Sequence, residues 1–227
     1  MLHFAVEPGL LQPHVPFELQ LFGGKAYVSL VRFKLERFRT RIAPALGRLL
    51  LRPFSDHGFL NLRTYVIHHA EQGIHFITEW LDNRLAVLAG PCTYGLPYRF
   101  GVIKRNAVFA RQGTLRFDLR VTDDAVHTAR SASLDEFLLE RYSAFTHHRG
   151  VGRVFRIRHK PWLQQPARAE LHDTSLIESA HPWFKHAEPV GAHACRDLIG
   201  VEISRPTRIK PKEQSVKPTP KELRHDL

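Results

Sequence analysis

Apolar and polar residues alternate over many short stretches of the chain, a period of two that is typical of β-strands. The clearest stretch is FLNLRTYVIHH, residues 59–69. One side of that strand is apolar, and the other carries a stripe of Asn61, Arg63 and Tyr65. An arginine in the middle of a strand needs a paired anion, water or a ligand beside it. The stripe is therefore the first candidate for a functional surface.

Further β-type patterns flank turn signals along the chain. Gly23-Gly24 supplies the positive φ angles of a tight hairpin, and Asp82-Asn83 is a tight-turn pair between two other runs. The strands expected besides 59–69 lie at 17–22, 25–35, 74–80, 84–90, 113–121, 152–159 and 194–204. Loops are expected at 160–166 and 179–189.

One segment shows clear helical spacing instead. In SASLDEFLLERYSAFT, residues 131–146, Ser133 and Glu136 form a capping-box pair just ahead of the apolar positions, and this pair predicts a helix start. Glu140 and Arg141 are expected to face away from the apolar stripe of this helix or to lie on its border.

At 227 residues the chain is long enough for one substantial domain, and its many short strands predict an α+β, mainly β barrel or sandwich with few helices. A weaker helical pattern at 41–52 adds one helix to this domain, which is expected to span 1–204. The remainder, 205–227, is rich in proline and charge and is expected to be a disordered basic tail.

Net charge raises a rival interpretation. Lys and Arg total 33 against 22 Asp and Glu, a formal +11 that would favour nucleic acid or an anionic membrane if it gathered on one face. The tail alone holds seven basic and three acidic residues, a net +4, and the rest is spread thinly. Nucleic-acid association is therefore expected only through the tail.

Compartment and membrane association follow from simple counts. No segment approaches the roughly 18 uninterrupted apolar residues that a membrane helix needs, and the first residues lack the pattern of a signal peptide. The two cysteines have no paired spacing, which favours a reducing compartment over a disulfide scaffold. A cytoplasmic protein without a membrane partner is expected.

The 15 histidines show no metal-binding pattern in the sequence, because HExxH, repeated His-x-His and Cys/His zinc spacings are all absent. A glycine-rich phosphate loop and a GxSxG elbow are absent too. We expect neither a metal site nor a cofactor.

Six motifs together resemble the YqjF-like family of uncharacterised bacterial proteins, which belongs to the acetoacetate decarboxylase-like superfamily. In chain order they are GGKAYVSLVRF, NLRTYV, DNRLAV, YGLPYRF, SLDEFLLERYSAFT and HKPWLQQPARAEL, and they cover about residues 4 to 200. The resemblance implies a cone-shaped, mostly antiparallel β-barrel whose lumen forms a small-molecule pocket. It also implies a smaller sheet and a few peripheral helices outside the barrel.

The resemblance further implies where a reaction centre would lie. In the decarboxylases an LDN motif is followed by a small apolar strand, a proline and two adjacent lysines, one of which forms a Schiff base with the keto acid. Matching Asp82-Asn83 and Pro97 to that pattern places Tyr98 and Arg99 where the lysine pair stands. A guanidinium stays protonated and a phenol is a poor imine former, so Schiff-base decarboxylation is not expected at this position.

The candidate site combines the stripe with residues around this position. The expected ligand-binding residues are Asn61, Arg63, Tyr65, Arg84, Tyr98 and Arg99. The arginines can hold a carboxylate in two hydrogen bonds. Their structural alternatives are an ion pair for Arg63, a turn contact for Arg84 and an exposed position for Arg99, and aromatic packing is the alternative for both tyrosines. Glu79 is the candidate general base.

Three functions stay open at this point. The first is a protein that binds a modest organic acid or other polar metabolite in a pocket. The second is a lyase or hydratase that acts on a keto or hydroxy acid without a covalent lysine, with Glu79 or a histidine as its base. The third is nucleic-acid association through the basic tail. A homo-oligomer is compatible with all three.

Overall fold

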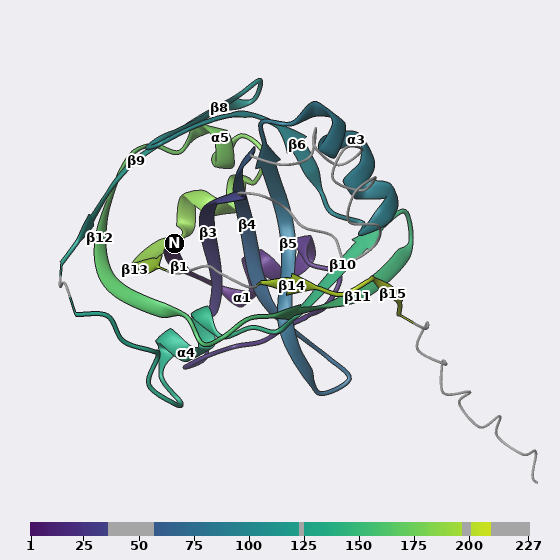
Figure 1. Cartoon of the computed structure of the whole chain (residues 1–227), viewed down its shortest axis with the longest axis horizontal. Coiled ribbons are helices and arrows are strands. Elements are labelled where there is room, and N and C mark those ends of the chain that lie inside the picture. Colours follow the sequence, from purple (N-terminus) through teal and green to yellow (C-terminus); the bar gives the residue numbers. More distant parts are fainter. Residues whose placement is uncertain (36–56, 123–124, 197–200, 210–227) are drawn as a thin grey trace, which may run out of the picture.

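The alternating segments become strands of one strongly curved sheet (Figure 1). The computed structural model describes residues 1–35, 57–122, 125–196 and 201–209. In chain order the strands are β1 (Leu2–Val6), β2 (Glu18–Leu19), β3 (Ala26–Leu35), β4 (His57–His68), β5 (Glu71–Leu81), β6 (Tyr98–Phe100), β7 (Val102–Lys104), β8 (Ala107–Ala110), β9 (Gly113–Val121), β10 (Ser143–His148), β11 (Val151–Arg158), β12 (Leu163–Asp173), β13 (Glu188–Arg196), β14 (Glu202–Ile203) and β15 (Thr207–Arg208). The mainly β prediction is confirmed.

Helices in the described residues are few and short. They are α1 (Pro8–Leu11), η1 (Gln12–His14), α3 (Arg84–Thr93), α4 (Leu134–Leu139), α5 (Ser175–Glu178) and η3 (Pro182–His186). The helix predicted at 41–52 lies outside the described residues. Strand pairing, rather than helix packing, therefore sets the architecture.

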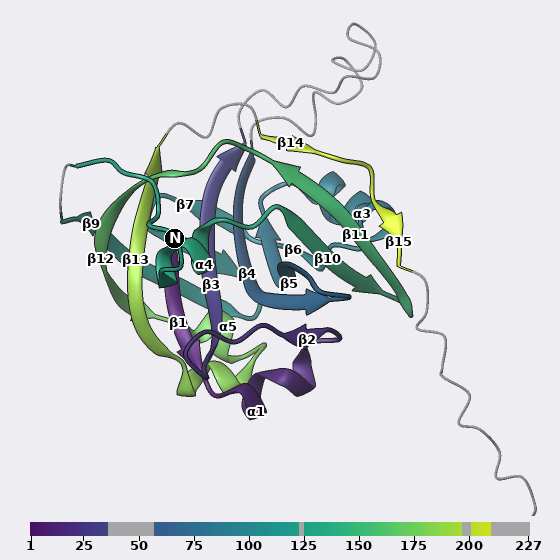
Figure 2. The same ribbon diagram turned by 90° about the horizontal axis from the view of Figure 1, so that it is seen from below.

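The sheet closes on itself. Its order runs β14–β11–β10–β5–β4–β3–β1–β13–β12–β9–β8–β7. Strand β6 pairs in parallel with β5 and continues past Gly101 into β7, so the far end of this path returns beside β5. The strands from β5 around to β6 and β7 thus form a barrel, and β10, β11 and β14 extend the sheet beyond it (Figure 2).

Strands β1, β3, β4 and β5 form a wall of this barrel, and one face of the wall is apolar. We call it the apolar face, and its residues are Leu2, Phe4, Val28, Leu30, Leu60, Leu62 and Trp80. Val108 and Leu115, from β8 and β9 across the barrel, join the same buried cluster, as do side chains of α5 and η3. The barrel interior is therefore filled with apolar side chains.

The opposite face of the wall carries the polar stripe predicted from the alternation in β4. We call it the polar face, and its polar residues are His3, Ser29, Asn61, Arg63, Tyr65 and Glu79. A second cluster, built around Tyr65 and Phe137, covers part of this face with α4. The stripe therefore points away from the packed barrel interior, and not into the lumen pocket that the resemblance implies.

Residues 84–90 form helix α3, and the strand prediction for them is wrong. The Asn83 side chain accepts hydrogen bonds from the backbone N–H groups of Leu85 and Ala86, at 3.0 and 3.1 Å, and so caps the helix. The Asp82-Asn83 pair begins a helix here and does not close a hairpin. A short, uniformly apolar run such as RLAVLAG does not separate strand from helix by its period.

The helix predicted over 131–146 starts as expected but ends early. Ser133 Oγ accepts a hydrogen bond from the backbone N–H of Glu136 at 3.2 Å, which confirms the N-terminal cap. Helix α4 then ends at Leu139, and β10 follows beside β5. Burial of β10 against the sheet overrides the local helical spacing.

The turn predicted at Gly23-Gly24 is confirmed, and the two predicted loops partly form regular structure. Gly23 and Gly24, with φ of 58° and 78°, close the predicted turn between Phe22 and Lys25. The loop predicted at 160–166 becomes strand β12 from Leu163 onward, and η3 lies inside the loop predicted at 179–189.

The predicted boundary between domain and tail falls inside the sheet. Strands β14 and β15 both pair with β11, so the ordered sheet reaches Arg208, beyond the expected boundary at 204. The remainder of the predicted tail, 210–227, lies outside the described residues.

Candidate ligand-binding site

Three neighbouring strands place three predicted site residues in one row across the polar face. Asn61 on β4 is the register partner of Glu79 on β5, and Glu79 is in turn the register partner of Tyr98 on β6. Directly paired residues in a sheet project from the same face and lie close together. We call Asn61, Glu79 and Tyr98 the polar row. The sequence predicted all three members, although it did not predict their alignment.

Glu79 is the carboxylic acid of the polar row. It is 4% exposed, and its Oε2 atom has no hydrogen-bond partner. Burial raises the pKa of Glu79 to about 8, and a hydrogen bond from Asn61 and the charge of Arg63 only partly oppose this rise. The carboxyl group is therefore mostly protonated at neutral pH and is able to donate a hydrogen bond. Asn61 is also 4% exposed, and its Oδ1 atom is a free acceptor.

Arg63 follows Asn61 by two residues on β4, so it lies on the same face, and its register partner on β5 is Phe76. Its Nη2 atom donates to the Leu138 carbonyl at 3.1 Å, while its Nε–H has no partner. No ion pair joins Arg63 to a carboxylate among the described residues. A part-buried guanidinium with an unused donor is a natural contact for an anion.

Tyr65 has a structural role that the sequence analysis left open. Its hydroxyl donates to the Leu138 carbonyl at 2.8 Å and lies 2.6 Å from Ser29 Oγ. The chain continues from Ser29 to His3 Nδ1 at 2.6 Å, and then from His3 Nε2 to His193 Nδ1 at 3.1 Å. Tyr65 is therefore the inner end of a buried hydrogen-bond chain that braces the polar face.

Tyr98 takes its place in the polar row by packing against α3. Its ring lies over Gly90, where a methyl group would overlap the ring carbons. Burial, the charge of Glu79 and Tyr94 raise the pKa of the Tyr98 phenol well above its usual range. The phenol is therefore neutral and can donate a hydrogen bond.

The remaining two predicted residues are not brought to the polar row. Arg84 is exposed at the start of α3, with its guanidinium carbon 4.6 Å from the centre of the Phe100 ring. Arg99 follows Tyr98 on β6 and so projects from the opposite face, where its charge adds to burial in lowering the pKa of His181 to about 4. The structure therefore does not bring Arg99 to the face that carries Tyr98.

Sequence reasoning missed Arg141. The helical pattern placed it on the border of an apolar stripe or facing away, but α4 ends at Leu139, so that pattern does not extend to it. Arg141 is 8% exposed, and its guanidinium carbon lies 4.6 Å from the ring centre of Phe137 and 5.6 Å from that of Tyr65. The sequence carries no signal for this position.

The lysines do not replace the missing reactive amine in the described structure. Side chains are described for Lys25, Lys104, Lys160 and Lys185, and all four are exposed. Lys25 pairs with Glu188, and Lys104 Nζ lies 5.5 Å from the ring centre of Phe109. None of these lysines reaches the polar row.

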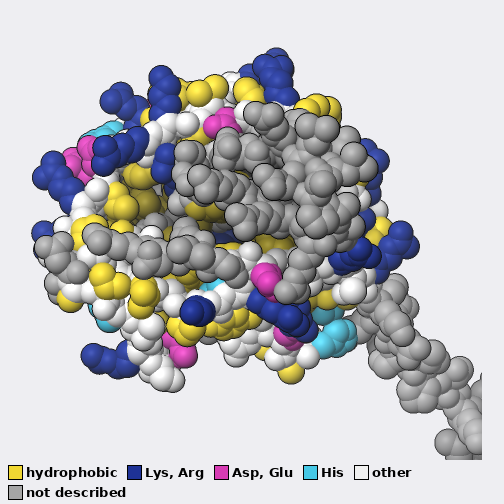
Figure 3. All heavy atoms as spheres, in the orientation of Figure 1, with side chains coloured by type: hydrophobic (Ala, Val, Ile, Leu, Met, Phe, Trp, Pro, Cys, Tyr) yellow, Lys and Arg dark blue, Asp and Glu magenta, His cyan; other side chains and the backbone are white. Residues whose placement is uncertain are grey.

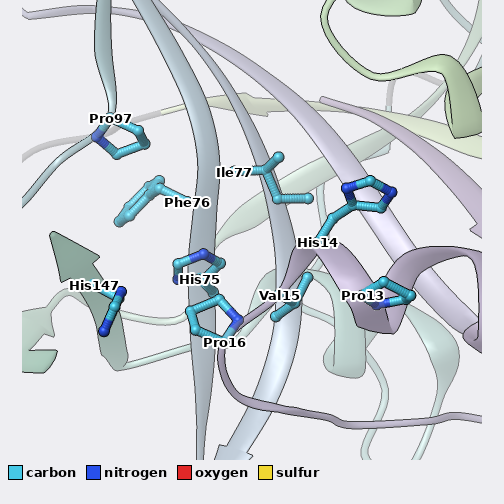
Figure 4. Close-up of a pocket in the computed structure, with 9 residues that line it drawn as sticks. All are labelled: Pro13, His14, Val15, Pro16, His75, Phe76, Ile77, Pro97 and His147. Carbon is cyan, nitrogen blue, oxygen red and sulfur yellow. The ribbon is translucent and has the colours of Figure 1, made fainter. Parts of the chain in front are cut away.

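A depression of about 340 Å³ opens at the edge of β5 (Figure 4). It lies where β10 leaves β5 after His75 and before β6 joins at Glu79. Its lining residues are Pro13, His14, Val15, Pro16, His75, Phe76, Ile77, Pro97 and His147. No predicted ligand-binding residue lines it. Phe76, the register partner of Arg63, is its link to the polar face.

The histidines of this depression do not assemble a metal site. Burial lowers the pKa of His75 to about 4, and its Nδ1 atom lies 2.9 Å from the Phe145 carbonyl. Across the described residues, no group of three or more His, Cys, Asp or Glu side chains is placed to hold a metal ion.

Basic side chains are scattered around the rim of the molecular face in Figure 3 and do not gather into one patch. None of the helices in the described part of the chain has the length and hydropathy to span a bilayer.

Sequence comparison finds a matching family and a matching relative, and both are described as uncharacterised. The model of the family DUF2071, described as an uncharacterized conserved protein, matches residues 1–197. The uncharacterized protein YqjF of Bacillus subtilis (strain 168) is 32% identical over 191 residues, which cover 79% of this chain and 76% of YqjF.

Structural comparison finds the same fold in enzymes. An acetoacetate decarboxylase-like enzyme from Sphingomonas wittichii RW1 matches with a TM-score of 0.61 at 17% identity, over 92% of this chain and 89% of that one. Acetoacetate decarboxylase from Legionella pneumophila subsp. pneumophila str. Philadelphia 1 matches with a TM-score of 0.52 at 13% identity, over 92% and 83%.

A third match is the enduracididine biosynthesis enzyme MppR, complexed with the condensation product of pyruvate and imidazole 4-carboxaldehyde. Its TM-score is 0.54 at 14% identity, over 84% of this chain and 78% of MppR. Identities this low establish a shared fold and leave the chemistry to the residues of each site.

Proposed function

The chain belongs to the DUF2071, or YqjF-like, family and has the acetoacetate decarboxylase-like fold, and from this premise we propose that its polar row and Arg63 together bind a small organic acid without a covalent bond. The ligand contacts in this proposal are Asn61, Arg63, Glu79 and Tyr98. A protein of the same fold, MppR, has been determined in complex with pyruvate, which supports a small acid as the ligand class.

The observation that carries the proposal is a set of unused hydrogen-bonding atoms on one wall. Glu79 Oε2, Asn61 Oδ1 and Arg63 Nε are all buried and without a partner. Leaving a buried polar group unpaired costs about 1–3 kcal/mol, so a fold seldom keeps three together without a use for them. A bound acid would use each of them.

The chemistry of these atoms selects the ligand. Arg63 Nε–H offers a charged donor to a carboxylate. Protonated Glu79 and the neutral Tyr98 phenol each offer a donor to a carbonyl or hydroxyl oxygen, and Asn61 Oδ1 accepts from a ligand hydroxyl or a protonated acid. This combination fits a keto acid or a hydroxy acid.

Covalent catalysis of the decarboxylase kind is excluded from this proposal. The residue beside Glu79 on β6 is Tyr98, and the lysines with described side chains are exposed. The proposal is therefore restricted to binding or to non-covalent acid–base chemistry.

One observation favours the enzyme alternative, a lyase or hydratase acting on a keto or hydroxy acid. With its pKa raised to about 8, Glu79 is poised near neutrality, where a group can both give and take a proton. In this alternative Glu79 protonates the substrate below its pKa and removes a proton above it.

A thermal-shift experiment tests the binding proposal. Pyruvate, acetoacetate and lactate at millimolar concentration should raise the melting temperature of the wild-type protein, whereas acetone, which lacks a carboxylate, should not. The shift should disappear in Arg63→Met and persist in Arg84→Met, the same change at an exposed arginine away from the polar row. An acid-induced shift that Arg63→Met leaves intact would refute the proposed contact.

A trapping experiment tests the absence of an imine. Incubation with acetoacetate and borohydride, followed by mass spectrometry of the intact chain, should show no added mass. A stable adduct on any amine would contradict non-covalent binding.

A further inference from the structure

The guanidinium of Arg141 lies beside the polar face and is more deeply buried than that of Arg63. Arg141 stacks on Phe137 and on Tyr65, and its Nη1 atom donates only to the carbonyl of the preceding residue, Glu140, at 3.1 Å. Its Nε–H is buried and has no hydrogen-bond partner. A cation that is 8% exposed and lacks a paired anion is costly to bury.

The acids near Arg141 are already engaged. Glu140 accepts hydrogen bonds from the Tyr142 hydroxyl at 2.5 Å and from the Trp162 backbone N–H at 2.8 Å. Glu136 accepts from the Ala132 backbone N–H at 2.7 Å. Neither carboxylate forms an ion pair with Arg141 within the part of the chain described. Burial lowers the pKa of Arg141, the charges of Glu136 and Glu140 oppose this only in part, and neither carboxylate accepts from its Nε–H.

Arg63 and Arg141 share one aromatic ring. The guanidinium carbon of Arg63 lies 6.0 Å from the centre of the Tyr65 ring, and that of Arg141 lies 5.6 Å from it. Burial lowers the pKa of Arg141, and the charge of Arg63 lowers it further, so the two cations repel each other. Each also keeps an unused Nε–H donor. An anion between them would relieve the repulsion and satisfy both donors.

We propose that Arg63 and Arg141 form a two-point anion site and that the ligand of the polar face is a small dicarboxylic acid. One carboxylate contacts Arg63 beside Asn61 and Glu79, and the second contacts Arg141. This inference rests on the proposed function and narrows its ligand class from organic acids in general to those with two acidic groups.

Calorimetric titration tests this inference with matched pairs of acids. The pairs are malonate with propionate, succinate with butyrate, and glutarate with pentanoate. A charged hydrogen bond contributes enough free energy to change affinity about tenfold or more. The wild-type protein should therefore bind at least one dicarboxylate about tenfold more tightly than its monocarboxylate partner.

The variant Arg141→Met keeps a long side chain on the two rings and removes the charge. It should lower the affinity for the dicarboxylate more than the affinity for the monocarboxylate, so that the preference for the dicarboxylate is lost. Arg63→Met should lower the affinity for both acids. The wild-type comparison needs no variant, so it remains decisive even if Arg141→Met fails to fold.

The outcomes separate this inference from the proposed function. If monocarboxylates bind in an Arg63-dependent way and dicarboxylates bind no better, the two-point site is wrong and the proposed function stands. An equal loss of affinity for both acids in a folded Arg141→Met would also overturn the two-point site, because Arg141 would then act on the whole site. If neither kind of acid binds the wild type, both proposals fall.

Discussion

The two faces of the wall formed by β1, β3, β4 and β5 are built by alternate residues of the same strands, and they differ in kind. The apolar face packs Leu62 and Trp80 against side chains from across the barrel, and the Trp80 indole N–H is a buried donor without a partner among these apolar groups. The polar face buries Asn61 and Glu79 as deeply as an ordinary core residue, yet leaves hydrogen-bonding atoms of both unused.

The difference distinguishes residues that stabilise the fold from residues that form the candidate site. Apolar burial stabilises a domain roughly in proportion to the area removed from water. Buried polar atoms without partners destabilise it, and places where local rules are broken without an evident structural gain are where function is expected. The apolar face is thus the source of stability, and the polar face is the candidate site.

The largest effect is expected from breaking the apolar face. Trp80→Ala removes the largest fully buried side chain and should lower the free energy of unfolding by about 4 kcal/mol, the usual cost of a large-to-small core change. Urea denaturation followed by circular dichroism measures it. A loss below about 1 kcal/mol would mean that this face is not the main core.

The next effect concerns Glu79 and depends on pH. Its folded pKa, about 8, lies above the ordinary value of 4.5, so the folded state holds a proton that the unfolded state has lost between these values. Wild-type stability should therefore fall as pH rises through this window. Glu79→Gln removes the titrating group. The free energy of unfolding of the variant, relative to that of the wild type, should therefore rise by on the order of 3 kcal/mol between pH 5 and pH 9.

The measurement is a pair of denaturation curves at each pH, and the quantity of interest is the difference between variant and wild type. Other groups that titrate in the same window cancel in that difference. Parallel pH profiles for the two proteins would show that Glu79 is not a buried, perturbed acid.

A smaller loss is expected from Ser29→Ala, which tests the hydrogen-bond chain behind the polar face. Removing the hydroxyl leaves His3 Nδ1 without its partner and separates it from Tyr65. The expected loss is about 2 kcal/mol, because the groups left behind are buried. Thr93→Ala, which removes an exposed hydroxyl from α3, is the control and should cost under about 0.5 kcal/mol.

The smallest effect on stability is expected from Gly90→Ala, although its effect on binding should be clear. The added methyl group would push the Tyr98 ring out of the polar row. The strain is partly offset by the better helix propensity of alanine, so a net loss of about 1 kcal/mol is expected. Gly9→Ala, where nothing lies within 4 Å of the new methyl, is the control. Unchanged acid binding in Gly90→Ala would remove Tyr98 from the site.

Features set by local sequence were predictable, and features set by contacts with other residues were not. The alternation in β4 placed Asn61 and Arg63 on one face, because a strand's period is a local property. The fate of residues 84–90 was not predictable from their apolar run, since the decisive contact is the cap made by Asn83.

Some residues of the candidate site were predictable from the sequence, but their arrangement was not. The resemblance led to Tyr98 as the residue in place of a lysine, but only the register between β5 and β6 sets it beside Glu79. Arg99 does not lie with Tyr98, because neighbouring residues on a strand project from opposite faces. Arg141 carried no signal, since its burial depends on the end of α4 and on Tyr65, which is far away in sequence.

A crystal structure of the protein soaked with succinate and, separately, with pyruvate tests the central claim most directly. The account predicts that each acid occupies the polar face, with a carboxylate at Arg63 Nε and its remaining oxygens near Asn61 and Glu79. An acid found instead in the depression lined by His14, His75 and His147, with the polar face unchanged, would contradict it.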